Sequence, residues 1–141
     1  MPEPGFIGRY ARLGALVALP FTALAQQRYT PDDWPEPLVA DVLLPRTEGA
    51  GLRPAALLVH GGGWRNRSRD DMAGIARQLA EQGYVTVNIE HRFVPEYRFP
   101  AQLHDLQQAM AWLHRHADEW QVDTNRIVGV GFSSGAHLVS L

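Results

Sequence analysis

Residues 128–141 read VGVGFSSGAHLVSL, and the spacing of their glycines indicates how this part of the chain folds. The segment GFSSG (131–135) fits the pattern G-x-S-x-G when the pattern is centred on Ser133. Centred on Ser134, it has no glycine at either flanking position. An apolar run precedes the serine and a helix-forming run follows it, so the motif predicts a sharp turn from a strand into a helix. Side chains at the two glycine positions would collide in such a turn.

Ser133 is the candidate nucleophile of this motif. The turn is expected to hold it in a strained backbone conformation, above the sheet edge and at the N-terminus of a helix. Free backbone N–H groups at that position favour an anion. A glycine-rich strand-to-helix turn without catalysis is the alternative. A dinucleotide-binding motif is not favoured, because the third glycine of G-x-G-x-x-G would fall on Ser134 and no acidic residue follows.

A second glycine motif, HGGGW at residues 60–64, follows an apolar run. Three consecutive glycines leave backbone N–H groups uncovered, and such groups can stabilise the oxyanion formed in acyl transfer. The motif lacks the G-K-[ST] ending of a phosphate-binding loop. His60 could act as a base, but its place between a strand and a glycine loop favours the role of a loop brace.

Strand-like and helix-like segments alternate from residue 38 onward. Strands are predicted at 38–45, 55–61, 84–92 and 127–133. The run at 55–61 is apolar throughout, which is typical of a strand buried on both faces. This alternation predicts an α/β fold with a mainly parallel sheet flanked by helices.

One helix is predicted to begin at Ser68, with Asp71 completing a capping box, and to end at Gly83. A second begins at Ala101 and has a regularly spaced apolar stripe. Its members are Leu103, Leu106, Met110, Leu113 and Ala117.

The segments between the predicted strands and helices have fewer residues that indicate a particular conformation. Residues 26–37 are predicted to be an extended lead-in, 46–54 a polar turn or hairpin connection, and 122–126 a turn. The loop 93–100 either lines the site entrance or is a structural loop in which Arg92 pairs with Glu96.

Composition excludes several classes of site. The chain has 141 residues, a formal net charge of −2 and no cysteine, which rules out disulfides, thiolate metal sites and a cysteine nucleophile. With this net charge, the sequence does not predict a basic surface that would bind nucleic acid. We expect no metal and no cofactor.

Residues 1–25 have the pattern of a secretory signal peptide. Arg9 and Arg12 precede the apolar run 13–24, and Ala23-Leu24-Ala25 fits an A-x-A cleavage site. The run is too short to span a bilayer comfortably. We therefore expect an exported protein, periplasmic or secreted, with no stable membrane span after cleavage. A short N-terminal core helix is the alternative.

HGGGW (60–64), EHRFVPEYRFPAQLHD (90–105) and DTNRIVGVGFSSGAHL (123–138) together resemble the α/β-hydrolase carboxylesterases with an HGGG oxyanion motif. These include hormone-sensitive-lipase-like, feruloyl and acetyl-xylan esterases. The resemblance implies that Ser133 is the nucleophile. It also implies that the backbone N–H groups of Gly62, Gly63 and Ser134 form the oxyanion hole, and that a small-molecule ester is the substrate.

The chain departs from the family pattern in three ways. Family members usually carry alanine where this chain has Ser134, Tyr-Arg where it has His91-Arg92, and a second glycine where it has Ala136. The donor at position 134 is a backbone N–H group, so serine can serve there in place of alanine. The change at His91-Arg92 affects no catalytic group.

The order Ser, acid, His places the other triad members after the serine, yet residues 134–141 contain no acid and only His137. The helix is expected to carry His137 away from the hydroxyl. His114 and His116 are expected on a solvated surface. Residues 26–141 are therefore interpreted as the N-terminal part of a catalytic domain, with little activity alone. An amidase, arylformamidase or peptidase on the same fold, or a non-catalytic product, is the alternative. The oligomeric state is unassigned.

Overall fold

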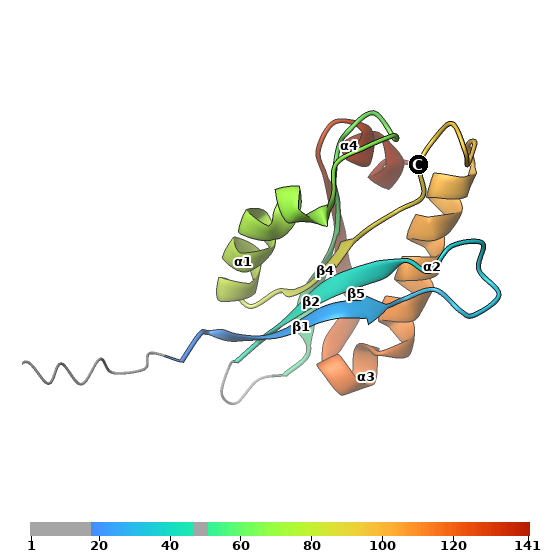
Figure 1. Ribbon diagram of the computed structural model, residues 1–141. Coiled ribbons are helices and arrows are strands. Elements are labelled where there is room, and N and C mark those ends of the chain that lie inside the picture. The colour runs from blue at the N-terminus through green and yellow to red at the C-terminus, as the bar shows by residue number, and fades with distance from the viewer. Residues whose placement is uncertain (1–17, 47–50) are drawn as a thin grey trace, which may run out of the picture.

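The computed structural model describes residues 18–46 and 51–141, which form one five-stranded sheet with helices on both faces (Figure 1). The spatial order of the strands is β1-β2-β4-β3-β5. Their bounds are β1 Phe21–Arg28, β2 Val39–Pro45, β3 Arg53–Val59, β4 Val85–Ile89 and β5 Val122–Gly131.

The sheet is mixed. Strands β4, β3 and β5 run parallel, whereas β2 pairs antiparallel with both β1 and β4. The parallel strands carry the two glycine motifs at their carboxyl ends, where ligands bind in open α/β sheets. The predicted α/β class with a largely parallel sheet is therefore confirmed, and the antiparallel part is confined to one side.

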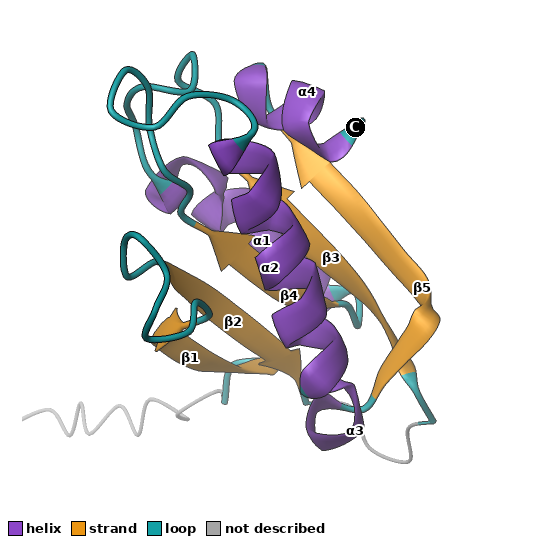
Figure 2. Cartoon of the chain, turned by 90° about the vertical axis from the view of Figure 1, so that its right-hand side faces the viewer, coloured by secondary structure: helices purple, strands orange, loops and turns teal. Residues whose placement is uncertain are grey.

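The helices lie on both faces of the sheet and at its carboxyl edge. Helix α2 crosses the face nearest the viewer in Figure 2, and α1 lies behind the sheet. Their bounds are α1 Ala73–Glu81, preceded by a short 3₁₀ turn at Arg69–Met72, then α2 Ala101–Arg115, α3 Ala117–Trp120 and α4 Ser134–Val139.

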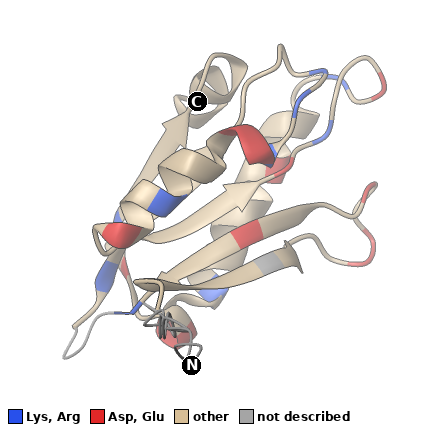
Figure 3. Cartoon of the chain, turned by 60° about the vertical axis from the view of Figure 1, so that its left-hand side comes forward, with Lys and Arg blue, Asp and Glu red and all other residues tan. Residues whose placement is uncertain are grey.

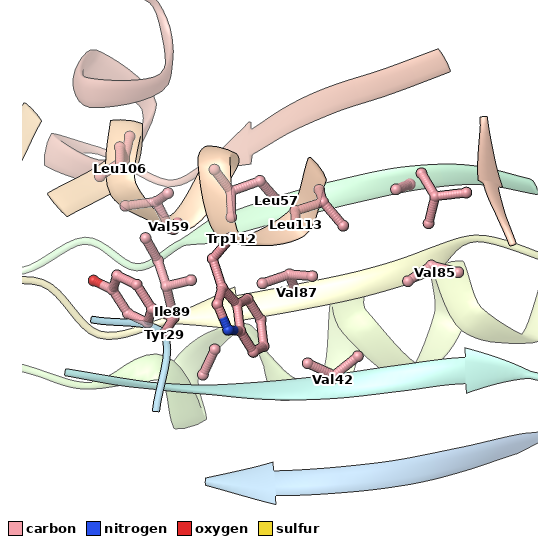
Figure 4. Close-up of a cluster of buried hydrophobic side chains, with 14 of the residues drawn as sticks. Tyr29, Val42, Leu57, Val59, Val85, Val87, Ile89, Leu106, Trp112 and Leu113 are labelled. Atoms are coloured by element: carbon pink, nitrogen blue, oxygen red, sulfur yellow. The ribbon is translucent and has the colours of Figure 1, made fainter. Parts of the chain in front are cut away.

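Alternate residues of β3 supply the two hydrophobic cores. Ala55, Leu57 and Val59 join the larger core with α2 (Figure 4), and Ala56 and Leu58 pack with α1. All five are buried, which confirms a strand covered on both faces. The predicted stripe is partly confirmed, because Leu106 and Leu113 of α2 are buried while Leu103 and Met110 are half-buried. Ala117 is also buried, but it begins α3 and does not continue α2.

Three predicted connections differ from the structure to different degrees. Part of the 26–37 segment belongs to β1, and residues 122–126 form the first half of β5 rather than a turn. For the segment 46–54, of which 47–50 lie outside the described residues, the hairpin alternative is wrong, because β2 and β3 are not neighbours in the sheet, and Arg53 and Pro54 belong to β3. At residues 26–28, 53–54 and 122–126 strand pairing overrides polar local sequence.

The predicted capping box is also wrong. Ser68 Oγ accepts a hydrogen bond from Asp70 N at 3.2 Å, so the serine caps the 3₁₀ turn that precedes α1. The Asp71 carboxylate instead accepts from Arg67 Nε at 2.6 Å. Gly83, at φ 95°, follows the helix end as expected.

The predicted signal peptide lies partly outside the described residues, since Arg9, Arg12 and the start of the apolar run fall within 1–17. Its last residues belong to β1, so the predicted cleavage point after Ala25 falls inside this strand. Export remains a prediction. In the described part of the chain, no helix has both the length and the apolar character needed to cross a bilayer.

Candidate active site

Ser133 occupies a strained turn between β5 and α4. Its φ of 52° and ψ of −117° lie outside the regions that side chains prefer, which confirms the predicted conformation. A Cβ on Gly131 would lie 2.4 Å from the carbonyl carbon of Gly135, and a Cβ on Gly135 would lie 2.1 Å from Val59 O. The spacing of the motif is therefore dictated by contacts with backbone atoms.

The two glycine motifs meet at the carboxyl edge of the sheet. Phe132 N donates to Val59 O at 3.3 Å, and a Cβ on Gly61 would lie 3.4 Å from Ser133 Cβ. Trp64 N approaches Ser134 Oγ at 3.4 Å. Because β3 and β5 are adjacent and parallel, residues 70 positions apart become neighbours.

The glycine loop has a conformation that suits exposed backbone donors. Gly62 and Gly63 have φ values of 116° and 62°. The N–H groups of Gly62, Gly63 and Ser134 form no hydrogen bond with another residue in the described ranges. These are the three donors that the resemblance implies, and they remain open to a ligand.

His60 joins the glycine loop to β4. Its side chain is fully buried, with Nδ1 2.6 Å from Gly61 O and Nε2 3.3 Å from Glu90 Oε2. A carbonyl oxygen only accepts, so Nδ1 carries the hydrogen. The His60 ring also stacks on His91 at a centroid distance of 4.6 Å. These contacts support the predicted role of a loop brace.

Glu90 is the centre of a network that links the site to the rest of the sheet. Arg69 donates to Glu90 Oε1 through its backbone N at 3.0 Å and through Nη1 at 2.9 Å. Arg69 Nε donates to Asp41 Oδ2 at 2.9 Å. Neither Glu90 nor Arg69 was predicted as a site residue, because no sequence motif joins positions that come from different elements.

The two stacked histidines have pKa shifts of opposite sign. Burial lowers the pKa of His60, but the Glu90 carboxylate and the Gly61 carbonyl outweigh burial, and the pKa is raised above its ordinary value. Burial lowers the pKa of His91, and the nearby His60 lowers it further. Burial raises the pKa of Glu90, but the contacts with His60 and Arg69 outweigh it and lower the pKa.

These shifts predict opposite pH dependence for two variants. His60 contributes stability below its unfolded pKa of about 6.5, and this contribution is lost as pH rises through its raised folded value. His91 contributes stability above about 6.5, which is lost as pH falls. We expect the free energy of unfolding to fall with rising pH in His91→Phe and to rise with pH in His60→Phe. Urea unfolding between pH 5 and 8 measures both slopes, and equal slopes would contradict the assignment.

The other histidines do not reach the Ser133 hydroxyl. The His137 ring lies edge-on to Trp64 at 5.5 Å, and no hydrogen bond joins it to Ser133 Oγ in the described chain. His104 and His114 are exposed. His116 is not on a purely solvated surface as predicted, because its ring packs against Trp112 and Trp120, with centroids 4.7 and 4.6 Å away, and these two rings also contact each other.

A small apolar cavity lies beside the glycine loop. Its volume is about 260 Å³, and its lining residues are Trp64, Val94, Phe99, Gln102 and His137. The prediction that the 93–100 loop lines an entrance is therefore supported by Val94 and Phe99. The predicted Arg92–Glu96 pair is wrong.

Arg92 pairs instead with the buried Asp105, through Nε at 2.8 Å and Nη2 at 2.8 Å. Both side chains are buried, so each charge is removed from water and is compensated by the opposite charge of the other. Across the described ranges, no group of three or more His, Asp or Glu side chains is arranged to hold a metal ion.

Comparison with known proteins identifies relatives of this chain. Residues 40–141 match the BD-FAE family. Over 89 residues the chain is 35% identical to Esterase LipC of Mycobacterium tuberculosis. This alignment covers 62% of this chain and 22% of LipC. A bacterial heroin esterase is 28% identical with a TM-score of 0.70, covering 85% of this chain and 37% of that one. Est2 of Thermogutta terrifontis is 26% identical with a TM-score of 0.74, and the match covers 82% of this chain and 42% of Est2.

The chain thus spans less than half the length of each of these three relatives. The family match covers most of the sequence and includes both glycine motifs. The structural relatives share the arrangement of sheet and helices described above. This chain belongs to the BD-FAE family and has the fold of the α/β-hydrolase esterases.

Proposed function

We propose that this protein takes part in the hydrolysis of small carboxylic esters, with Ser133 as the nucleophile. The observation that carries the proposal is the turn at Ser133, whose φ is 52°, directly beside the glycine loop. A strained nucleophile next to unpaired backbone donors is the arrangement that acyl transfer requires. The esterase relatives support an ester substrate.

In the proposed reaction Ser133 Oγ attacks the ester carbonyl carbon and gives up its proton to a base. The carbonyl oxygen becomes an oxyanion, which accepts hydrogen bonds from the N–H groups of Gly62, Gly63 and Ser134. Removing one such donor typically costs about 2.7–4 kcal/mol of transition-state stabilisation. The alcohol leaves with a proton, and water then releases the acid and regenerates the serine.

The proposed oxyanion donors lie within the described residues, but no side chain there is placed to act as a base for Ser133. Residues 134–141 contain no acid, and His137 contacts Trp64 instead of the hydroxyl. We therefore propose that the 141-residue chain alone turns esters over slowly. An oxyanion hole without an intact triad retains a rate of about 10³–10⁴-fold over water.

Mass spectrometry of the chain incubated with p-nitrophenyl acetate tests this proposal. We expect a slowly formed, stoichiometric acetyl adduct on the peptide that contains Ser133. Ser133→Ala should abolish this adduct, because the nucleophile is gone. The matched control Ser134→Ala should retain it, because the donor at position 134 is a backbone group.

Acetylation that persists in Ser133→Ala, or that is lost equally in Ser134→Ala, would contradict the assignment of the nucleophile. Rapid turnover that depends on Ser133 would contradict the slow activity of the chain while leaving the nucleophile in place. Incubation with an anilide and a formamide separates the two enzyme classes, since faster acylation by either would favour an amidase.

We also propose export, on the pattern of residues 1–25 alone. Cleavage after Ala25 would leave Gln26–Arg28 of β1, of which only Gln27 and Arg28 are in register with β2. Expression in a bacterial host should give a periplasmic product whose mass corresponds to a chain beginning at Gln26. A cytoplasmic product that retains residues 1–25 would contradict the proposal.

A further inference from the structure

A second cavity lies at the carboxyl end of β4, on the side of the sheet away from β5. Its volume is about 370 Å³, within the range of small-molecule sites. The segment 36–39, the end of β4 and the loop that follows it all contribute to its walls. Its polar lining residues are Glu36, Arg69, Glu90, His91, Glu96 and Tyr97.

Two of the three carboxylates in this cavity have no cationic partner. Glu90 pairs with Arg69 and contacts His60. Glu36 and Glu96 form no ion pair within residues 18–46 and 51–141. Burial raises the pKa of Glu36, and the negative charges of Glu96 and Asp105 raise it further. Acidic residues on loops are red in Figure 3. Glu36 and Glu96 thus line one cavity without forming an ion pair, and Arg69 of the same lining is already paired with Glu90 and Asp41.

His91 adds a buried acceptor to the same cavity. The residue is 2% exposed, and its Nδ1 lies 3.0 Å from Arg92 O, so Nδ1 carries the hydrogen. Because burial lowers the pKa of His91, the ring is neutral near pH 7 and Nε2 presents a lone pair. Nε2 has no hydrogen-bond partner in the described chain. A buried, unsatisfied acceptor is costly unless a ligand or water donates to it.

These groups select the chemistry of a ligand. Three of the unpaired groups, the Glu36 and Glu96 carboxylates and His91 Nε2, are acceptors, and two of these carry negative charge, so a complementary ligand has N–H donors and positive charge. Phe93 and Tyr97 add aromatic wall, which also favours a cation. The sequence has no lysine, so no lysine side chain of this chain can fill the cavity.

We propose that the cavity formed by Glu36, His91 and Glu96 binds a small primary ammonium compound. The ammonium group donates hydrogen bonds to the two carboxylates and to His91 Nε2, and its alkyl part contacts Phe93 and Tyr97. Strand β3 separates this cavity from Ser133, which places the two about 10 Å apart by strand spacing. The proposal does not depend on the ester hydrolase function.

Isothermal titration calorimetry of the 141-residue chain at low salt tests the site with n-butylammonium chloride. We expect saturable binding with one site per chain. n-Butanol, which lacks the charge, and tetramethylammonium, which lacks the N–H donors, should each bind at least tenfold more weakly. Calcium chloride tests for a divalent metal site, and we expect no binding.

Three substitutions localise the site. Glu96→Gln and Glu36→Gln should each weaken n-butylammonium binding at least tenfold. The matched control Glu81→Gln, which removes the same charge from an exposed residue of α1, should leave binding unchanged. In His91→Phe the acceptor is lost and binding should weaken similarly. Circular dichroism of each variant separates loss of binding from loss of fold.

An NMR titration gives a second readout in the unchanged chain. The ¹⁵Nε2 resonance of His91 should shift on addition of n-butylammonium and stay unchanged on addition of n-butanol. Equal binding of all organic probes, full affinity in Glu96→Gln, or preferential binding of calcium would each overturn the proposal.

Discussion

Replacing Gly135 by alanine is expected to destabilise the fold by about 3 kcal/mol or more, because the added methyl group has no space. A Cβ there would lie 2.1 Å from Val59 O and 2.5 Å from His60 O. Both are backbone atoms at the end of β3, so no side-chain rotation relieves the overlap. Overpacking a core with flexible neighbours already costs about 1–3 kcal/mol. Urea unfolding followed by tryptophan fluorescence measures the change.

Gly74→Ala is the matched control for this prediction. Gly74 lies within α1, and a Cβ there would have no atom within 4 Å. Alanine inside a helix is more stable than glycine by about 0.5–1 kcal/mol, so this variant should be slightly stabilised. A Gly135→Ala protein as stable as Gly74→Ala would show that the turn at Ser133 is not held by close backbone contact.

Asp105→Ala should have the second large effect, a loss of about 3–5 kcal/mol. Asp105 is fully buried and accepts from Arg92 N at 2.8 Å, from Arg92 Nε at 2.8 Å and from Trp34 Nε1 at 2.9 Å. Arg92 is only 6% exposed, and the substitution leaves its guanidinium group without the carboxylate that balances its charge. Breaking a buried pair on one side is costly because the remaining charge stays out of water.

Asp123→Ala provides the comparison on the surface. Asp123 accepts from Arg126 Nε at 2.7 Å, but both side chains are in contact with water. Exposed pairs contribute about 0–1 kcal/mol, so this variant should unfold almost as the parent does. If the two variants lost similar stability, burial of the Arg92–Asp105 pair would not be the source of the effect.

The sequence alone predicted the parts of the protein in which one local pattern has one physical solution. The apolar run before His60 predicted a strand covered on both faces, and β3 is buried in this way. The glycines around Ser133 required a turn too tight for side chains, and Gly131 and Gly135 each lie against backbone. The alternation of strand-like and helix-like segments predicted the fold class, and the strands that precede the two glycine motifs are parallel.

The sequence predicted the conformation of polar segments less well, because whether a segment forms a strand depends on the neighbouring strand as well as on its own residues. Residues 122–126 look like a turn in sequence, but they extend β5. Residues 21–28 form β1 because β2 supplies the backbone partners. Local propensity is a weak guide where hydrogen bonds to a distant strand decide the conformation.

The sequence by itself determined the α/β fold, the strained serine turn and the glycine loop, since each rests on backbone sterics and hydrophobic periodicity within about ten residues. The tertiary structure alone decided that Arg92 pairs with Asp105, that His60 stacks on His91 and contacts Glu90, and that Glu36 and Glu96 border one cavity. Electrostatic contacts depend on distance in space and on burial, and neither quantity follows from spacing along the chain.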